Sequence, residues 1–161
     1  LIKKKALMIK INVILSNFSW KKYLKNPKRL IGQSIRIINK KEKNYKKKLF
    51  IFTLLLSGSK EIKKLNKKFR KKNKTTDILS FPFNEKKNLK NLILNKKEIY
   101  LGDVILNIDK IKGKQNNKSF KSEFNKLWIH GFVHLLGYKH KTNIDFNLMK
   151  KIEKKYLNYI K

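Results

Sequence analysis

Residues 49–59 read LFIFTLLLSGS, and this stretch decides the fold class. Residues 49–56 are apolar apart from Thr53, which is the pattern of a buried strand. The Ser-Gly-Ser segment that follows ends the strand with turn chemistry. We expect Ser59 to be the N-cap of a helix that runs to about Lys72. Three apolar residues at helical spacing line one face of that helix, namely Ile62, Leu65 and Phe69.

Three other segments have the pattern of strands. Residues 9–15 alternate apolar and mostly polar side chains, which predicts an opening strand with one buried face. Residues 78–83 form a short apolar strand, and Pro82 places it at an edge of the sheet or at a strand end. Residues 99–108 are the fourth candidate.

Helices are expected between and after these strands. The expected helical segments are a region around Trp20, Tyr23 and Leu24, a helix from Pro27 through Ile38, the helix from Ser59, a long buried helix over 120–136, and a last helix over 145–160. We expect a polar connection over 86–97 and a basic loop over 112–119. Because strands and helices intermix, we predict an α/β (or α+β) fold. The prediction is a single domain, residues 1–161, with a small mixed sheet of about four strands packed with about five helices.

The charge of the chain is extreme. It has 43 Lys and Arg against 10 Asp and Glu, so 43 − 10 gives a net charge of +33. Only three of the 43 are Arg, which leaves 40 Lys. This bias, with plentiful Asn and Ile, is typical of A+T-rich codons, so mutation pressure accounts for much of the excess. Whatever its origin, such a surface attracts polyanions, with an affinity that falls as salt rises.

Composition also excludes several classes of protein. The chain has no Cys, which excludes disulfides, thiolate nucleophiles and Cys-containing zinc sites. Its longest strongly apolar run, residues 49–56, is far shorter than the roughly 20 residues that span a bilayer. Residues 3–15 resemble a signal peptide only faintly, because Lys10 and Asn12 interrupt the apolar stretch and no small-residue cleavage site follows. We therefore expect a cytoplasmic protein with no membrane partner.

All three His residues of the chain fall within residues 130–140, which read HGFVHLLGYKH. On a helix, His130 and His134 are four residues apart, so both rings lie on the same face and can reach one ion. A straight helix would turn His140 away from that ion. Gly137 can take positive φ at a helix C-terminus and reverse the chain, which brings His140 back. This arrangement predicts a metal site on a helix-turn segment.

Three neutral imidazoles bind Zn²⁺ and leave a fourth tetrahedral position for water, which is the pattern of a catalytic site. The alternative is that these His residues are ordinary core or surface residues, and three of them at this spacing in a His-poor chain argue against it. A structural metal site is a further alternative. It lacks a fourth protein ligand nearby in the sequence, although Asp145 is a candidate.

The spacing His-x-x-x-His-x-x-Gly-x-x-His is also that of the metzincin zinc peptidases. Those enzymes place a Glu directly after the first His as general base, and this chain has Gly131 there. Glycine has no side chain that accepts a proton, so a peptidase is disfavoured. A close packing or substrate approach would explain a glycine inside a helix. The uncompensated charge of a cation held by three neutral ligands suits an anionic phosphodiester.

The chain resembles the YbeY family of single-strand-specific metallo-endoribonucleases. The family hallmark is His-Gly-x-Leu-His-Leu-x-Gly-Tyr-Asp-His, and residues 130–140 match it except for Val133 and Lys139, which replace Leu and Asp. Arg70 followed by Thr-Asp-Ile-Leu-Ser-Phe-Pro over residues 76–82 is similar to the family's Arg and Thr-Asp-Val-Leu-Ser-Phe-Pro segment. Leu-Gly-Asp over residues 101–103 is similar to a third family element. These motifs span about residues 60–145.

The resemblance implies one Zn²⁺ per chain, held by His130, His134 and His140, with Arg70 and His134 active in RNA cleavage. It implies a zinc-dependent hydrolase, an endonuclease that acts in 16S ribosomal RNA 3′-end maturation and ribosome quality control. The expected partners are single-stranded ribosomal RNA, the small ribosomal subunit and assembly proteins, and no DNA partner is expected. The alternative is a ribosome-assembly factor that binds RNA and has a structural or weakly active metal site.

The residues give an independent reason to single out Arg70. In a chain that uses Lys 40 times among its 43 basic residues, an Arg marks a place where the planar guanidinium grips phosphate. Arg29 and Arg36 weaken this argument, because both are expected on the surface of a helix. Asp77 and Asp103 are expected to cap, to hold a His ring or to dock a partner.

Three further side chains are candidates for either of two roles. Ser80, Phe81 and Phe83 either line the groove beneath the metal or belong to the core. Trp128 is expected in the core, because it lies within the apolar pattern of the long helix before the first His ligand.

Overall fold

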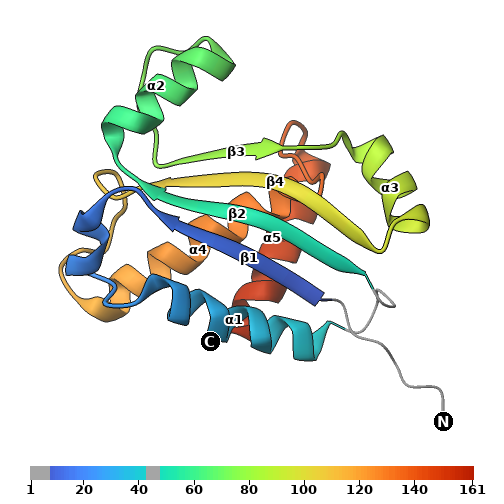
Figure 1. Ribbon diagram of the computed structural model, residues 1–161, viewed down its shortest axis with the longest axis horizontal. Helices are drawn as coiled ribbons and strands as arrows, with labels where there is room; N and C mark the ends of the chain where they lie inside the picture. Colours follow the sequence, from blue (N-terminus) through green and yellow to red (C-terminus); the bar gives the residue numbers. More distant parts are fainter. Residues whose placement is uncertain (1–7, 43–47) are drawn as a thin grey trace.

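A four-stranded sheet lies at the centre of the structure, a computed structural model that describes residues 8–42 and 48–161 (Figure 1). The strands are β1 (Met8–Leu15), β2 (Leu49–Ser57), β3 (Ile78–Pro82) and β4 (Glu98–Asn107). Their order in the sheet is β1-β2-β4-β3, with β1, β2 and β4 parallel and β3 antiparallel to β4. The predicted mixed sheet of four strands is confirmed. Residues 3–7, part of the stretch that faintly resembles a signal peptide, lie outside the described residues.

The strand at residues 49–57 is an inner strand, as its apolar sequence predicts. It pairs with β1 on one side and with β4 on the other. Alternate residues point into the main core, namely Phe50, Phe52, Leu54 and Leu56. The short strand β3 lies at an edge of the sheet and ends at Pro82, in agreement with the sequence prediction.

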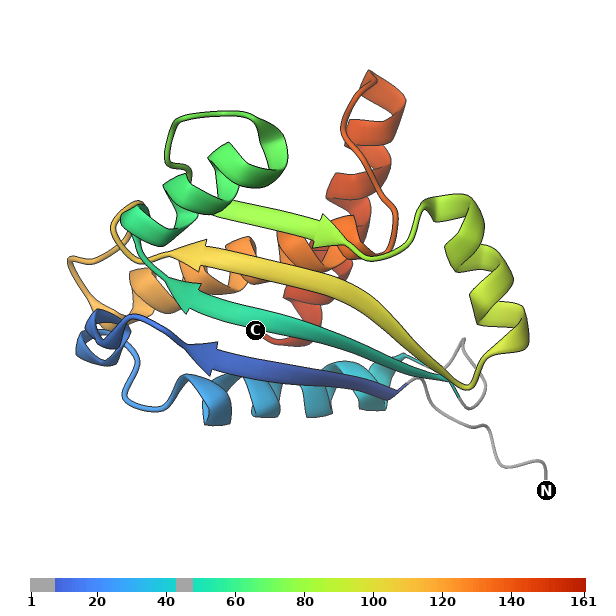
Figure 2. The ribbon, with the colours of Figure 1, turned by 45° about the horizontal axis from the view of Figure 1, so that its top comes forward.

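Five α-helices and one short 3₁₀-helix surround the sheet. They are η1 (Phe18–Lys22), α1 (Pro27–Lys41), α2 (Ser59–Arg70), α3 (Lys86–Asn95), α4 (Asn117–Leu135) and α5 (Asn143–Tyr159). Figure 2 shows α1, α4 and α5 on one side of the sheet, whereas α2 lies beside β3. The long helix α4 is the centre of the helical layer, and Trp128 on it is fully buried, as expected. None of the helices in the described part of the chain combines the length and the apolar character needed to cross a bilayer.

The polar connection expected over residues 86–97 is wrong, because Lys86–Asn95 is helix α3. Leu89 is buried, and Leu92 and Ile93 pack against the main core. These three residues have helical spacing, but the Lys and Asn side chains between them obscured the pattern. The helix places Lys86 against Gly137 in the turn after α4.

The start of α2 also differs from the expectation. Gly58 is the N-cap, and Ser59 is the first helical residue with no capping bond from Gly58. The backbone N–H of Ser59 instead donates to Asp109 Oδ2 at 2.8 Å. A carboxylate that is 50 positions away in the chain therefore satisfies a free N–H of the first turn, and local sequence reasoning does not detect such a partner.

Three helix ends are shifted by a few residues. Helix α2 ends at Arg70, before Lys71 adopts a left-handed conformation with φ of 57°. Helix α4 begins at Asn117, inside the expected loop, because the Asn116 side chain accepts from the N–H of Ser119 and caps the first turn. Helix α5 begins at Asn143.

Helix α5 is held against α1 by Glu42. This residue is almost fully buried, accepts a hydrogen bond from the Tyr159 hydroxyl at 3.1 Å and pairs with Lys155 Nζ at 2.6 Å. Met149 and Tyr156 on the inner face of α5 join the main core. These contacts set the position of α5 beside α4, where the His residues lie.

Candidate metal centre

The three His residues meet at the C-terminal end of α4. His130 and His134 are one turn apart on α4, and their Nε2 atoms are 3.1 Å apart. His140 follows the helix, and its ring centroid is 4.9 Å from that of His134 and 5.8 Å from that of His130. One ligand atom from each ring lies within 4.8 Å of the other two, and the group can hold a metal ion. The sequence prediction that these three rings converge is confirmed.

A turn at Gly137 brings His140 to the helical pair. The N–H of Gly137 donates to the carbonyl of His134 at 2.9 Å, and the N–H of Tyr138 donates to that of Val133 at 3.4 Å. This pair of bonds is the Schellman motif that ends helices. It requires a left-handed residue, and Gly137 has φ of +89°. The sequence prediction for this glycine is confirmed.

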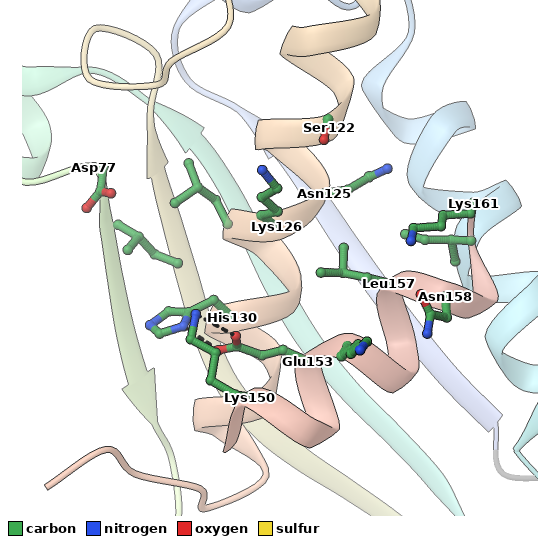
Figure 3. Close-up of a pocket in the computed structure, with 14 residues that line it drawn as sticks. Asp77, Ser122, Asn125, Lys126, His130, Lys150, Glu153, Leu157, Asn158 and Lys161 are labelled. Carbon is green, nitrogen blue, oxygen red and sulfur yellow. Dashed lines mark hydrogen bonds and ion pairs between the residues drawn. The ribbon is translucent and has the colours of Figure 1, made fainter. Parts of the chain in front are cut away.

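Hydrogen bonds at Nδ1 orient two of the rings. His130 Nδ1 lies 2.7 Å from Glu153 Oε1 (Figure 3), and His134 Nδ1 lies 2.9 Å from the carbonyl oxygen of Tyr138. Both partners only accept hydrogen bonds, so we assign the proton of each neutral ring to Nδ1. The lone pair of each ring is then on Nε2, the atom that faces the other ring. Backbone and carboxylate partners of this kind are typical of metal-binding histidines.

The arrangement fits a divalent cation. Two neutral Nε2 acceptors at 3.1 Å repel each other unless a positive charge lies between them. Two nitrogens that share a tetrahedral zinc ion at bond lengths of about 2.0–2.1 Å lie roughly 3.3 Å apart. Burial lowers the pKa of His134 below its ordinary value and outweighs the opposite effect of the Tyr138 carbonyl. The ring is therefore neutral near pH 7, as a metal ligand must be.

Sequence reasoning did not identify Glu153 as part of this site. It is a buried carboxylate on α5, on the same face as Met149 and Tyr156. Burial alone would raise its pKa, but the hydrogen bond from His130 and the charge of Lys150 lower the pKa below its ordinary value. The sequence did contain a signal for Glu153. A Glu at a position on the apolar face of an amphipathic helix breaks the apolar pattern, and its carboxylate needs a buried partner.

Replacement of Glu153 by Gln is expected to weaken zinc binding about 10- to 100-fold, because the neutral amide holds the His130 ring less strongly. The measurement is a zinc titration against a chromophoric chelator. Glu123→Gln is the matched control, since Glu123 is also on a helix but pairs with Lys126. Equal zinc affinities for the two variants would show that Glu153 does not position His130.

Gly131 is explained by close packing. A Cβ atom there would lie 2.5 Å from Val104 Cγ1 and 3.0 Å from Ile78 Cδ1, so α4 approaches β3 and β4 at the distance that only glycine allows. The next residue after the first His ligand therefore faces the sheet. A general base at this position, as in the metzincin peptidases, has no room.

Arg70 lies in the same pocket as the three His residues. This pocket has a volume of about 340 Å³. Its lining residues are Arg70, Ile78, Ser80, Pro82, His130, His134, Tyr138, Lys139 and His140. Arg70 Nη2 donates to the carbonyl of Ser80 at 3.2 Å, and its guanidinium carbon lies 5.7 Å from the centroid of the Phe81 ring. These two contacts hold an exposed cation at the rim of the His cluster.

The neighbouring residues of β3 divide between the two sides of the sheet. Ser80 lines the His pocket. Phe81 packs with Ile62 and Leu79 in a small second core, and Phe83 is exposed beside the Tyr100 ring. Of the three candidates for the groove, only Ser80 lies there.

The Asp candidates lie outside the ligand group. Asp103 accepts from the Tyr100 hydroxyl at 2.6 Å, and Asp77 Oδ1 accepts from Thr76 Oγ1 at 3.1 Å. Asp145 is in the first turn of α5, where its N–H is capped by Thr142. Within the described ranges 8–42 and 48–161, the three His residues alone form a group of potential ligands for one ion. Arg29 and Arg36 are exposed on α1, as expected.

The chain is similar to known proteins over almost its whole length. A family described as Endoribonuclease YbeY matches residues 15–161. The endoribonuclease YbeY of Pelagibacter ubique is 42% identical over 156 residues, which cover 96% of this chain and 97% of that protein. The endoribonuclease YbeY of Buchnera aphidicola subsp. Acyrthosiphon pisum is 44% identical over 121 residues, or 72% and 74% of the two chains. A Thermotoga maritima protein with a known solution structure shares 25% identity at a TM-score of 0.57, over 94% and 89% of the two chains.

Proposed function

This chain belongs to the YbeY family of endoribonucleases, and from that premise we propose that it is a zinc-dependent enzyme that cuts single-stranded ribosomal RNA. The proposed role is 3′-end maturation of 16S ribosomal RNA and ribosome quality control in the cytoplasm. The proposed partners are the small ribosomal subunit and its assembly proteins. One observation carries the proposal. Two imidazoles present their Nε2 atoms to each other at 3.1 Å, with His140 beside them and an exposed arginine side chain at the rim.

The three imidazoles, His130, His134 and His140, would hold the zinc ion. When bound, zinc supplies Lewis acidity toward a phosphoryl oxygen and lowers the pKa of water to about 7. Glu153 and the Tyr138 carbonyl keep the His130 and His134 rings in the ligating orientation. These ligands carry no negative charge, so the centre retains its attraction for an anionic phosphodiester.

Arg70 is proposed to bind the phosphate that is cut. Its guanidinium has five N–H groups, and the bond to the Ser80 carbonyl uses one of them. The remaining donors can grip two phosphate oxygens and stabilise the charge that develops on them. Lys139 lines the same pocket and adds a positive charge beside His140. The family hallmark has Asp at this position, so this chain attracts the substrate more strongly there.

A second candidate function is a ribosome-assembly factor whose metal is structural. The observation that favours it is the hydrogen bond between His130 on α4 and Glu153 on α5, which connects the His cluster to a second helix. A cation at this point would therefore also stabilise the α4–α5 contact.

A ribonuclease assay with a chelator decides between these functions. We expect purified protein to contain about one zinc per chain and to cut single-stranded RNA but neither duplex RNA nor single-stranded DNA. Incubation with EDTA and removal of the chelate should abolish cleavage, and one equivalent of Zn²⁺ should restore it. Cleavage that persists without metal would contradict the proposal. Loss of the folded state on metal removal, measured by circular dichroism, together with no cleavage by the loaded protein, would favour the assembly factor.

A further inference from the structure

A second and larger pocket adjoins the His cluster. It has a volume of about 760 Å³ and lies between α4 and α5, beside the start of β3 (Figure 3). We call it the α4–α5 groove. Its lining residues are Asp77, Ile78, Ser122, Asn125, Lys126, Leu127, His130, Lys150, Glu153, Lys154, Leu157, Asn158, Ile160 and Lys161. Ile78 and His130 line both this groove and the His pocket, so a long substrate bound at one can continue into the other.

The rims of the groove are cationic. Four lysines line it, namely Lys126, Lys150, Lys154 and Lys161, against two acidic residues. One of the two acids, Glu153, accepts from His130 and lies 3.6 Å from Lys150, so its charge is already engaged. In the parts of the chain that the structure describes, Lys154 has no ion-pair partner, and Lys126 has only an exposed pair with Glu123. Exposed pairs of this kind contribute little, so both lysines are available to a ligand.

The interior of the groove has a different chemistry from its rims. Its apolar part consists of aliphatic side chains, Ile78, Leu127, Leu157 and Ile160, and the lining residues include no Phe, Tyr or Trp. Asn125, Asn158 and Ser122 supply neutral hydrogen-bonding groups. A ligand that matches this groove is polyanionic along its length and also has flat apolar surfaces and polar edges. A nucleic acid strand has all of these features.

The cations also follow a line. Lys150 and Lys154 line the groove from α5, and Lys161 lines it just beyond the C-terminal end of that helix. From Lys150 to Tyr159 the helix rises about 13 Å, at 1.5 Å per residue. This length suits the backbone of a few nucleotides, and it begins next to Glu153 and His130. The lysines of the groove therefore extend away from the His cluster along α5.

We propose that the α4–α5 groove holds the RNA strand on one side of the cut, with phosphates at the lysine rims and bases against the aliphatic floor. This inference rests on the proposed function and adds the path of the substrate. Because the lysines contact phosphates, their contribution to binding in the groove does not depend on base sequence. The Arg70 pocket then holds the scissile phosphate at the end of this path.

A pair of matched double variants tests the groove. Lys126→Gln with Lys154→Gln removes one cation from each rim, and Lys28→Gln with Lys40→Gln removes two exposed cations from α1. The probe is a fluorescent 12-nucleotide single-stranded RNA, titrated by anisotropy in EDTA, where no metal-dependent cleavage occurs. We expect about a tenfold weaker Kd for the groove variant, a change of under twofold for the control, and a salt dependence shallower by about 1.4 in log–log slope.

Chemical protection supplies a second measurement. The chain has no cysteine, so a single introduced thiol is unique. In the Asn158→Cys variant, the RNA probe should slow alkylation at least fivefold, whereas alkylation of a Lys28→Cys variant should not change. A poly-glutamate peptide of the same charge should protect neither thiol.

Three results would overturn the groove proposal. They are equal losses of affinity in the two double variants, no protection of the thiol in the Asn158→Cys variant, and equal protection by poly-glutamate, which would indicate an acidic protein or nonspecific attraction. These measurements are made without metal, so they are separate from the cleavage assay. Failure of cleavage with intact groove binding would reject the enzymatic proposal. Normal cleavage without binding in the groove would reject only the groove proposal.

Discussion

Replacement of His134 by Ala is expected to remove zinc from the protein and to reduce RNA cleavage on the order of a thousandfold or more, which equals about 4 kcal/mol of lost transition-state stabilisation. His134 faces both other rings, and its Nδ1 is held by the Tyr138 carbonyl, so no neighbouring side chain replaces it. The measurements are zinc content by elemental analysis, folding by circular dichroism and cleavage of a single-stranded RNA. Lys139→Ala is the control, because Lys139 lines the same pocket but is not one of the grouped ligands. It should retain its zinc.

The three readouts of this variant separate the competing hypotheses. Loss of zinc with undiminished cleavage would exclude the zinc mechanism. Loss of zinc together with loss of the folded state would favour a structural metal, because the imidazole pair and Glu153 connect α4 to α5. Retention of one zinc per chain would contradict the ligand assignment.

Replacement of Arg70 by Ala is expected to reduce cleavage about 100- to 1000-fold while zinc content stays unchanged. The side chain lies at the rim of the His pocket and contacts none of the rings by a hydrogen bond, so its loss removes phosphate stabilisation and not the metal. Removal of one such preorganised donor costs about 2.7–4 kcal/mol in comparable sites. Arg70→Lys should recover only part of the rate, because an ammonium lacks the planar pair of donors.

Arg36→Ala is the matched control for this prediction. Arg36 is exposed on α1 and is not one of the residues that line the His pocket. Its replacement by Ala removes one positive charge, as the Arg70 variant does. Full cleavage by the Arg70 variant would contradict its assigned role. A loss of cleavage in proportion to a loss of zinc would show instead that Arg70 supports the metal site through Ser80 and β3.

The sequence predicted the sheet well because its strands carry strong local signals. The inner strand at residues 49–57 is an apolar run ended by Gly58, and the edge position of β3 follows from Pro82. Helix α3 was missed because few of its residues are apolar. The sequence placed the N-cap of α2 at Ser59 and not at Gly58, because the N–H of Ser59 donates to Asp109, which lies far away in the chain.

The His cluster was also predictable, because its geometry is local. Two of the His residues share one face of a helix, and a single glycine with φ of +89° brings the third back to them. Periodicity and turn chemistry act over a few residues, so one sequence contains all the information that this arrangement needs.

What the sequence alone determined is therefore the convergence of three His residues on a helix-turn segment, together with the strands of the sheet. Only the tertiary structure decided that Glu153 of α5 fixes the ring of His130, that the Ser80 carbonyl holds Arg70 at the rim of the His pocket, and that a lysine-lined groove continues from this pocket. The physical reason is the separation along the chain between the residues that interact. Backbone preferences and helical spacing are read over a few neighbouring residues, whereas these contacts depend on how the helices pack on the sheet, and that packing is decided by the whole core at once.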